Sequence, residues 1–327
     1  MQKIKWGMIG CGDVTEVKSG PAFSNVPDSE LVAVMRRNAE KAEDYAKRHN
    51  VPRWYSDADK LINDPEINAV YIATPPDSHC EYTLRVAATG KPIYVEKPMA
   101  RSYDECQRMI DACDKANVPL FVAYYRRALP DHLKVKELLD SGAIGEVRFV
   151  NIRLYWPTNW QIDLSKGDLP WRVDPEIAGG GYFFDLASHS FDFLDFIFGP
   201  VKKAAGLVAN QAGLYKAEDI VAANFEFESG VIGSGVWCYS IDETSRTEVT
   251  EIVGATGRIT YHSFSPGPVR LETVDGVQEF DPEMPQHVHQ PLVQTVVDEL
   301  LGRGKCPSTG SSGARTNWVL DQIVNEQ

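Results

Sequence analysis

Up to about residue 123, short runs of apolar, β-branched residues alternate with segments of helix length. The apolar runs are expected to form strands: Ile4–Ile9, Leu31–Met35, Ala69–Ala73, Pro92–Val95 and Pro119–Ala123. The segments between them carry helical patterns: Asn38–His49, Ser78–Thr89 and Ser102–Ala116. Because strands joined by helices pair in parallel through right-handed crossovers, this alternation predicts a doubly wound parallel sheet.

Helix signals occur where such a fold needs them. Asn38 can cap the helix that follows it, and Gly90 can end the helix before the fourth strand. Ser102 followed by Glu105 is a capping-box pattern. Each signal supports the assigned boundary of a helix.

After residue 145 the pattern changes to longer strands with alternating polar and apolar residues. These are Glu146–Tyr155, Val201–Ala209, Val221–Phe227, Val231–Tyr239, Glu248–Val253, Arg258–His262 and Val269–Thr273. Turn signals such as Glu228-Ser229-Gly230 and Asp275-Gly276 join them, which favours a large, mainly antiparallel sheet. Helices are expected at about Asp185–Phe198, at about Leu292–Leu301 and at the end of the chain.

The chain is therefore expected to form two domains. Its 327 residues exceed the roughly 250 to 300 residues at which one hydrophobic core stops growing. We assign residues 1–123 to a dinucleotide-binding domain of the Rossmann type. Residues 124–327 are expected to form a second, α+β domain, and its last helix (about 314–326) is expected to pack back on the first domain.

Composition excludes several classes of function. Hydrophobic residues make up 43% of the chain and charged residues 24%, as in soluble globular proteins. A formal net charge of -13 repels nucleic acids and anionic membranes.

The six cysteines are scattered without a CxxC pair, which argues against disulfides and zinc and favours the cytoplasm. The N-terminal segment lacks a signal-peptide pattern, and no apolar run is long enough to span a membrane.

The first strand ends in a glycine loop, Gly10-Cys11-Gly12-Asp13-Val14-Thr15, that opens a helix. Glycines at this position let the backbone approach the pyrophosphate of a dinucleotide. Thr15 replaces the third glycine of the usual motif, so a plain turn is the alternative. The series of strands and helices that follows favours the dinucleotide.

The second strand ends in Arg36 and Arg37 instead of the acidic residue that holds the ribose in NAD-binding sites. Two arginines suit a 2′-phosphate, so we predict that NADP(H) is favoured over NAD(H). The alternative is that these arginines are solvated charges at the entry of a helix.

The stretch GGGYFFDLASHSFD (Gly179 to Asp192) predicts a helix with a special polar face. At 100° per residue, one face carries polar side chains: Asp185, Ser188, His189, Asp192 and Asp195. The alternative is an ordinary amphipathic helix whose polar face meets water, but the lysines and glutamates of such a face are missing. No metal site is predicted, because this face has no recognised ligand spacing and the HVH at residues 287–289 fits a strand or loop equally well.

Several motifs occur in one order along the whole chain: Gly10-x-Gly12, Thr74-Pro75-Pro76 with His79, Glu96-Lys97-Pro98, Trp171-Arg172, the triple glycine and Asp185-x-x-x-His189. Together they resemble the Gfo/Idh/MocA oxidoreductase family, named for glucose-fructose oxidoreductase, inositol dehydrogenase and a rhizopine-catabolism protein. The resemblance implies a Rossmann domain, a second domain built on an antiparallel sheet, and a nicotinamide between them. It places Lys97 at the carboxyl edge of the parallel sheet, where open α/β sheets bind ligands; the alternative for this motif is a surface ion pair.

The resemblance also implies an activity and site residues. It implies hydride transfer between nicotinamide and a secondary alcohol or ketone of a sugar, polyol or inositol-like compound. His189 would be the acid/base, Lys97 the electrostatic partner and Asp185 a substrate-binding or orienting group. Which of Lys97 and His189 accepts the proton is left open by the resemblance. The expected cofactor-binding residues are Gly10, Gly12, Asp13, Val14, Arg36, Arg37, Thr74, Pro75, His79, Glu96, Lys97, Trp171 and Arg172. The expected substrate-binding residues are Tyr125, Arg126, Trp156, Trp160, Asp185 and His189.

Two other activities occur among proteins of this type. One is a regulator that binds the dinucleotide without turnover, and the other is a glycoside hydrolase that uses NAD transiently. Lys97, Asp185 and His189 are all present, which argues against the regulator. The resemblance further implies that residues 124–327 serve substrate binding and oligomerisation, and that the protein is a homodimer or homotetramer.

Overall fold

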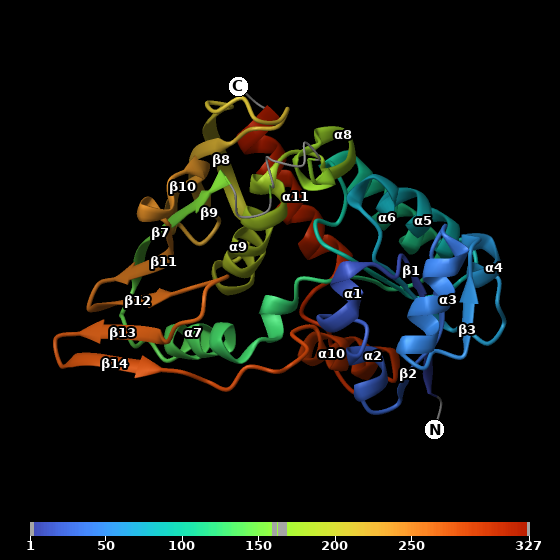
Figure 1. Ribbon diagram of the computed structural model, residues 1–327. Coiled ribbons are helices and arrows are strands. Elements are labelled where there is room, and N and C mark those ends of the chain that lie inside the picture. Colours follow the sequence, from blue (N-terminus) through green and yellow to red (C-terminus); the bar gives the residue numbers. More distant parts are fainter. Residues whose placement is uncertain (1–2, 159–161, 163–168, 326–327) are drawn as a thin grey trace. The chain divides into compact units, whose positions relative to one another are not determined.

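The structure is a computed structural model that describes residues 3–158, 162 and 169–325 (Figure 1). It divides into two compact units. The first comprises Met1–Leu129 and Pro285–Ala314, and the second comprises Pro130–Met284 and Arg315–Gln327. These units differ from the expected division between residues 123 and 124, because residues 124–129 and the later segment 285–314 both group with the first unit.

The first unit contains a six-stranded sheet in the order β3-β2-β1-β4-β5-β6. All its strands are parallel, which confirms the doubly wound fold. The strands are β1 (Ile4–Ile9), β2 (Ser29–Met35), β3 (Arg53–Tyr55), β4 (Ala69–Ile72), β5 (Ile93–Val95) and β6 (Leu120–Val122). Its helices are α1 (Asp13–Val17), α2 (Ala22–Asn25), α3 (Ala39–Arg48), α4 (Ala58–Ile62), α5 (His79–Ala87), α6 (Tyr103–Ala116) and α10 (Gln290–Leu300).

The sheet of the first unit has a separate hydrophobic core on each face. Successive residues of a strand point to opposite faces, so Tyr94 belongs to one core while Ile93 and Val95 belong to the other. Helix α10 contributes Leu292, Val293, Val296 and Val297 to the core that contains Tyr94. This burial explains why α10 belongs to the first unit although it follows the strands of the second in sequence.

The expected caps are present. The Asn38 side chain accepts a hydrogen bond from the Lys41 amide at 2.9 Å, and the Ser102 hydroxyl accepts one from the Glu105 amide at 3.3 Å. Sequence analysis did not identify β3 and α4, which are only three and five residues long. Elements this short carry too few residues for a periodic pattern.

The second unit contains an eight-stranded sheet in the order β14-β13-β12-β11-β7-β10-β9-β8. Among the described strand pairs of this sheet, only β7 and β10 are parallel, so the expectation of a mainly antiparallel sheet is confirmed. The strands are β7 (Val147–Pro157), β8 (Val201–Ala209), β9 (Ile220–Phe227), β10 (Ile232–Ile241), β11 (Thr247–Gly254), β12 (Gly257–Tyr261), β13 (Val269–Thr273) and β14 (Gly276–Phe280). Its helices are α7 (Pro130–Asp140), α8 (Pro175–Ala178) and α9 (Tyr182–Phe198).

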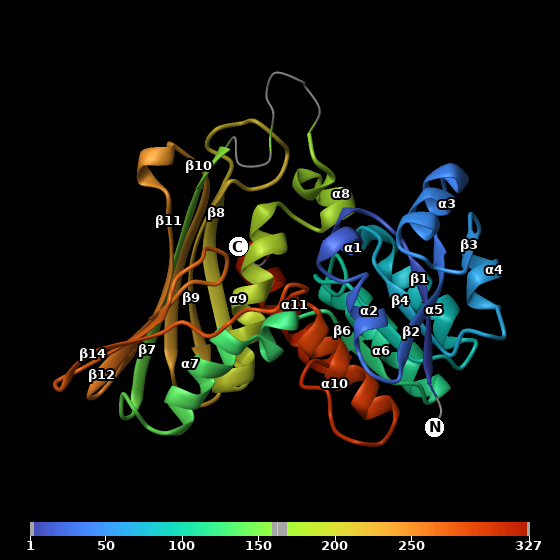
Figure 2. The same ribbon diagram turned by 60° about the horizontal axis from the view of Figure 1, so that its bottom comes forward.

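Helices α7 and α9 lie along one face of this sheet (Figure 2). Helix α9 packs Phe183 and Phe191 against Trp237 of β10, with ring centroids 5.1 and 5.6 Å apart. Large apolar side chains on three strands of the sheet remain exposed: Phe149, Leu207 and Ile232. Phe149 and Ile232 are paired neighbours on β7 and β10.

The last helix, α11 (Gly310–Asn325), begins in the first unit and ends in the second. Its first turn lies on β6, because a Cβ at Gly313 would be 2.7 Å from the Val122 side chain. Along the described residues, no helix is both long enough and apolar enough to cross a bilayer.

Candidate functional site

The glycine loop joins β1 to α1 at the carboxyl edge of the parallel sheet. Gly10 has φ +96°, and a Cβ there would lie 2.8 Å from the backbone of Ala73 and Thr74. The Gly12 amide donates to the Gly10 carbonyl at 2.8 Å, which closes the turn. Glycine is therefore required at Gly10 both for the left-handed backbone and for the close approach of the next strand end.

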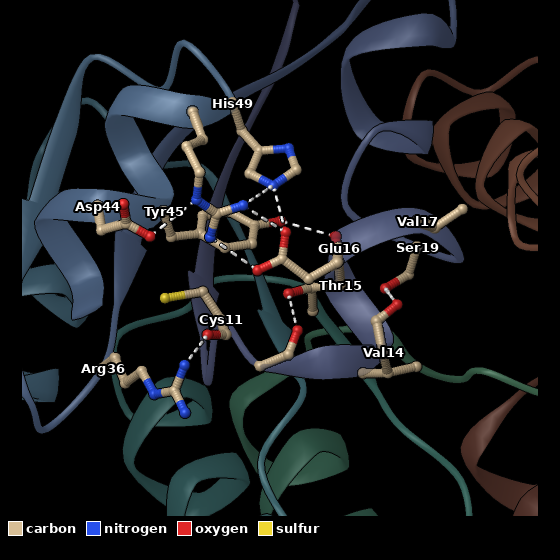
Figure 3. Close-up of polar contacts among 12 residues, drawn as sticks. Cys11, Val14, Thr15, Glu16, Val17, Ser19, Arg36, Asp44, Tyr45 and His49 are labelled. Carbon is tan, nitrogen blue, oxygen red and sulfur yellow. Dashed lines mark hydrogen bonds and ion pairs between the residues drawn. The ribbon is translucent and has the colours of Figure 1, made fainter.

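Thr15, in place of the third glycine, is part of the structure of the loop (Figure 3). Its hydroxyl donates to the Gly12 carbonyl at 2.7 Å, and its own carbonyl accepts from the Tyr45 hydroxyl at 2.8 Å. The glycine that permits close packing is Gly20, where a Cβ would lie 2.1 Å from the Thr15 carbonyl oxygen. The departure from the usual motif is thus accommodated by a hydrogen bond and by a glycine further along the chain.

Two charged contacts fasten this loop to its neighbours (Figure 3). The Arg36 guanidinium donates to the Cys11 carbonyl at 3.1 Å, which places the end of β2 beside the loop. The Glu16 carboxylate accepts from Arg48 at 2.7 Å and lies 2.8 Å from His49 Nε2. The hydrogen bonds from Arg48 are the main cause that lowers the pKa of Glu16 to about 2. Arg37, in contrast to Arg36, is exposed.

His79 joins the loops that follow β4 and β5. It is fully buried, with Nε2 2.7 Å from the Thr74 carbonyl and Nδ1 3.1 Å from the Pro98 carbonyl. The Lys97–Pro98 peptide bond is cis. Burial lowers the pKa of His79, and the Thr74, Met99 and Pro98 carbonyls around the ring oppose that shift. This histidine holds the Thr74-Pro75 turn and the turn after Lys97 together.

Glu96 and Lys97 leave β5 at the same edge. Lys97 is half-buried, whereas Glu96 is buried and accepts hydrogen bonds from the Tyr71 hydroxyl and, at 3.2 Å, from the Lys97 amide. Burial raises the pKa of Glu96, and Tyr71 and Lys97 oppose that rise. The alternative of a surface ion pair for this motif does not fit, because Glu96 is only 5% exposed.

In the second unit, the triple glycine forms the entry to α9. Gly179 ends α8 with φ +87°, and a Cβ at Gly180 would lie 2.1 Å from the Phe184 ring. The Gly181 amide donates to Glu218 Oε1 at 2.9 Å, and a Cβ there would lie 2.9 Å from the Glu218 carbonyl. The close approaches that the glycines permit are therefore to the protein itself.

Helix α9 does not present its polar face to water. Ser188, His189, Asp192 and Asp195 are all buried. Asp195 accepts two hydrogen bonds from the Arg315 guanidinium, each at 2.7 Å. The alternative of a solvated amphipathic helix is therefore wrong.

The predicted site residues of the second unit form two contacting sets. In the first, Arg172 Nε lies 3.2 Å from Asp185 Oδ2, and the guanidinium lies 4.5 Å from the centroid of the Trp171 ring. In the second, the His189 ring lies 5.9 Å from Phe264, which lies 5.5 Å from Trp156.

Of the remaining predicted substrate-binding residues, Tyr125 and Arg126 belong to the first unit. There the Arg126 guanidinium lies 5.0 Å from the Tyr125 ring centroid. Trp160 lies outside the described residues.

Sequence reasoning missed several residues that contact this machinery. Tyr71, Glu218, Phe264 and His289 are far in sequence from the groups they contact. Only His289 had a signal, as part of the HVH segment, and that segment was considered only as a metal site. The other three sit in ordinary strand and loop patterns.

Comparisons with known proteins agree with this geometry. The model of an oxidoreductase family with an NAD-binding Rossmann fold matches residues 4–124, and that of the GFO/IDH/MocA C-terminal domain matches residues 132–260. The chain is 40% identical to Oxidoreductase P35 of Formosa agariphila over 98% of both chains. It is 26% identical to 1,5-anhydro-D-fructose reductase of Ensifer adhaerens, over 97% of this chain and 93% of that protein.

A solved structure has the same fold over nearly its whole length. This is the aldose-aldose oxidoreductase of Caulobacter crescentus complexed with glycerol, which aligns with a TM-score of 0.84 at 25% identity and covers 98% of this chain and 96% of that one. Because the two family models match the two regions that carry the glycine loop and the Asp185–His189 helix, the chain belongs to the Gfo/Idh/MocA family of NAD(P)-dependent oxidoreductases.

Proposed function

We propose that this oxidoreductase interconverts a secondary alcohol and a ketone of a sugar, polyol or inositol-like compound. The observation that carries the proposal is a set of three side chains: Lys97 at the carboxyl edge of the parallel sheet, and the partly buried Asp185 and the buried His189 on α9. Relatives named for anhydrosugar and aldose chemistry support the substrate class.

The glycine loop fits a dinucleotide, because Gly10 and Gly12 leave no side chains over the turn at the edge of the parallel sheet. The bound nicotinamide supplies the acceptor or donor for hydride. The residues of this chain then accept or donate the proton of the substrate hydroxyl and stabilise the charge that develops on its oxygen. In the oxidative direction the substrate's C–H bond breaks with its electron pair, and its hydroxyl loses a proton.

We assign that proton to His189 and the stabilisation of the developing charge on oxygen to Lys97. Asp185 is held by Arg172 at 3.2 Å, so its carboxylate has a fixed orientation for a substrate hydroxyl. The aromatic set of His189, Phe264 and Trp156 supports a sugar-binding role for Trp156, since aromatic rings pack against the apolar faces of sugars.

We also propose that NADP(H) is favoured over NAD(H). Arg36 is held beside the glycine loop by the Cys11 carbonyl, and Arg37 is exposed and adjacent. A 2′-phosphate at the end of β2 would meet one or both guanidinium groups.

A homodimer or homotetramer is proposed from the large sheet. Phe149, Leu207 and Ile232 are 44%, 80% and 59% exposed on three of its strands, as expected for a face that pairs with a second copy. An Ile232→Lys variant should then run as a smaller species than the wild type in size-exclusion chromatography with light scattering, whereas an unchanged mass would contradict use of this face.

All six cysteines lie within the described residues, where they are buried and form no disulfide. This supports the proposal of a reducing, cytoplasmic compartment.

The test of the function is incubation with NAD(P)+ and a panel of sugars, polyols and inositols, followed at 340 nm, with an aryl glycoside included. A rise in absorbance with one of the polyols or sugars supports the dehydrogenase. Release of the aglycone without net reduction of the cofactor would favour the hydrolase. If neither the absorbance at 340 nm nor the aglycone concentration changes with any compound of the panel, a dinucleotide-binding regulator is favoured.

A further inference from the structure

The first unit contains a buried polar cluster, one member of which, Glu96, directly precedes Lys97 in the sequence. We define the Glu96 cluster as Ser19, Tyr71, Glu96 and His289, which come from four separate segments. Their exposed fractions are 0%, 0%, 5% and 1%. Burying four polar residues in one place is costly unless each is held in a specific arrangement.

Both carboxylate oxygens of Glu96 have donors inside the unit. The Tyr71 hydroxyl donates to Oε1 and lies 3.0 Å from Ser19 Oγ. The backbone amide of Lys97 donates to Oε2 at 3.2 Å. A hydroxyl and an amide that both point at a carboxyl group stabilise its ionised form. Glu96 therefore holds the main chain of Lys97 at the point where it leaves β5.

His289 closes the other side of Glu96. Its Nδ1 is 3.7 Å from Glu96 Oε1, which is too long for a hydrogen bond, and its ring lies 4.5 Å from that of Tyr125. Among the described residues, Nε2 has no hydrogen-bond partner. The backbone amide of His289 donates to the Lys18 carbonyl at 3.3 Å, which fixes the segment to the end of α1.

The His289 ring is neutral at neutral pH. Its pKa is lowered to about 3, first by burial and then by the positive charges of Lys18, Lys97 and Arg126. A charged imidazolium 3.7 Å from Glu96 would attract its carboxylate and weaken the interaction of that carboxylate with Lys97. A neutral ring fills the space beside the carboxylate without weakening that interaction.

We propose that Glu96, Tyr71 and His289 are positioning residues for Lys97, with Glu96 fixing its main chain, Tyr71 fixing Glu96, and His289 packing against Glu96. The inference rests on the proposed function, because it assigns Lys97 to the reaction. It also changes the role of Glu96, which the sequence assigned to cofactor binding, to one that acts through its neighbour.

The test compares variants in two backgrounds. Glu96→Gln, Tyr71→Phe, His289→Ala and His289→Phe are made in the wild type and in Lys97→Ala. The measured quantities are kcat, obtained with enough enzyme to follow the slow variants, and the Kd of NADP(H) from a fluorescence titration. Tyr55→Phe is the matched control, since the Tyr55 hydroxyl also donates to a carboxylate, that of Asp64 at 2.9 Å, but at the end of β3.

In the wild-type background, Glu96→Gln, Tyr71→Phe and His289→Ala should lower kcat about 10- to 100-fold, because a shift of roughly 1 Å in a reacting group costs about 100-fold. The Kd of NADP(H) should change by less than about threefold, which corresponds to less than about 0.7 kcal/mol of binding free energy. His289→Phe keeps a ring of similar size against Tyr125 and should keep kcat within about threefold of the wild type. Tyr55→Phe should keep full activity.

In the Lys97→Ala background, none of the cluster variants should cause a further loss, because residues that act through one group are not additive. A full additional loss there, or a rise in the Kd of NADP(H) of about tenfold or more with unchanged kcat, would overturn the inference and return Glu96 to cofactor binding. Equal losses in His289→Phe and His289→Ala would overturn the packing role of His289. If Lys97→Ala alone keeps near-normal kcat, the proposed function fails instead.

Discussion

Replacing Gly180 by alanine should damage both stability and activity, although Gly180 itself carries no functional group. An ideal Cβ at this position lies 2.1 and 2.6 Å from two carbons of the Phe184 ring. Carbon atoms prefer separations of about 3.5 to 4.0 Å, so the overlap exceeds 1 Å. Phe184 is 1% exposed and packs against Phe183, so it cannot turn away without moving its neighbours.

The magnitude follows from this overlap. Overpacking of a buried site costs about 1 to 3 kcal/mol. The least costly response is a shift of the first turn of α9, which carries Asp185, and a displacement of about 1 Å at a reacting group lowers kcat about 100-fold. We therefore expect a loss of about 1 to 3 kcal/mol in unfolding free energy together with a fall in kcat of about 10- to 100-fold.

The matched control is Gly199→Ala at the other end of the same helix. Gly199 has φ +84°, but a Cβ there meets nothing within 4 Å. It should cost about 1 to 3 kcal/mol, because φ +84° with ψ -172° is a backbone region that essentially only glycine adopts, and it should leave kcat unchanged. Urea unfolding followed by tryptophan fluorescence, with kcat on the same samples, separates the two. Wild-type stability and activity in Gly180→Ala would refute the packing account of the triple glycine.

Three further predictions concern charged groups. The folded-state pKa of Glu16 is about 2 against an ordinary value of 4.5, so its contribution to stability is complete above about pH 4.5 and is lost as the pH falls toward 2. Because Glu16 is 35% exposed, that contribution is about 1 kcal/mol, and Glu16→Gln should flatten the acid limb of a stability-against-pH curve by this amount; an unchanged limb would contradict the assignment. Arg37→Ala should lower kcat/KM for NADP(H) about tenfold or more with little effect on NAD(H), and equal effects on both cofactors would contradict the proposed preference. Asp195→Ala should cost about 1 to 3 kcal/mol, and the loss should shrink in an Arg315→Ala background, since the two side chains form a two-bond ion pair; full additivity in the double variant would show that the pair contributes nothing.

The periodic parts of the fold could be predicted from sequence. Except for β3, the strands of the parallel sheet are short apolar runs bounded by caps and glycines, and except for β14, the strands of the second sheet follow from alternating patterns that the structure confirms. Helix α10 shows the limit of such reasoning. Its amphipathic pattern predicts a helix, but nothing in the pattern says that this helix contacts α2, near the start of the chain, and shares a core with the parallel sheet.

Site residues that stand in short sequence motifs could be predicted, whereas residues that reach the site only through tertiary contacts could not. Lys97 and His189 stand in short motifs that can be read directly. The triple glycine was also noticed, but its physical reason is packing against Phe184 and Glu218, which requires coordinates. Tyr71 reads as one more apolar strand residue, and only the fold brings its hydroxyl to Glu96.

The assignment of Lys97 and His189 to one reaction is tested most directly by measuring kcat and the Kd of NADP(H) for Lys97→Ala, His189→Ala and the double variant on the best substrate from the panel. We predict that each single variant loses at least about 100-fold in kcat while the cofactor affinity stays close to that of the wild type, and that the double variant loses much less than the product of the two. Near-normal turnover in both single variants would contradict the account.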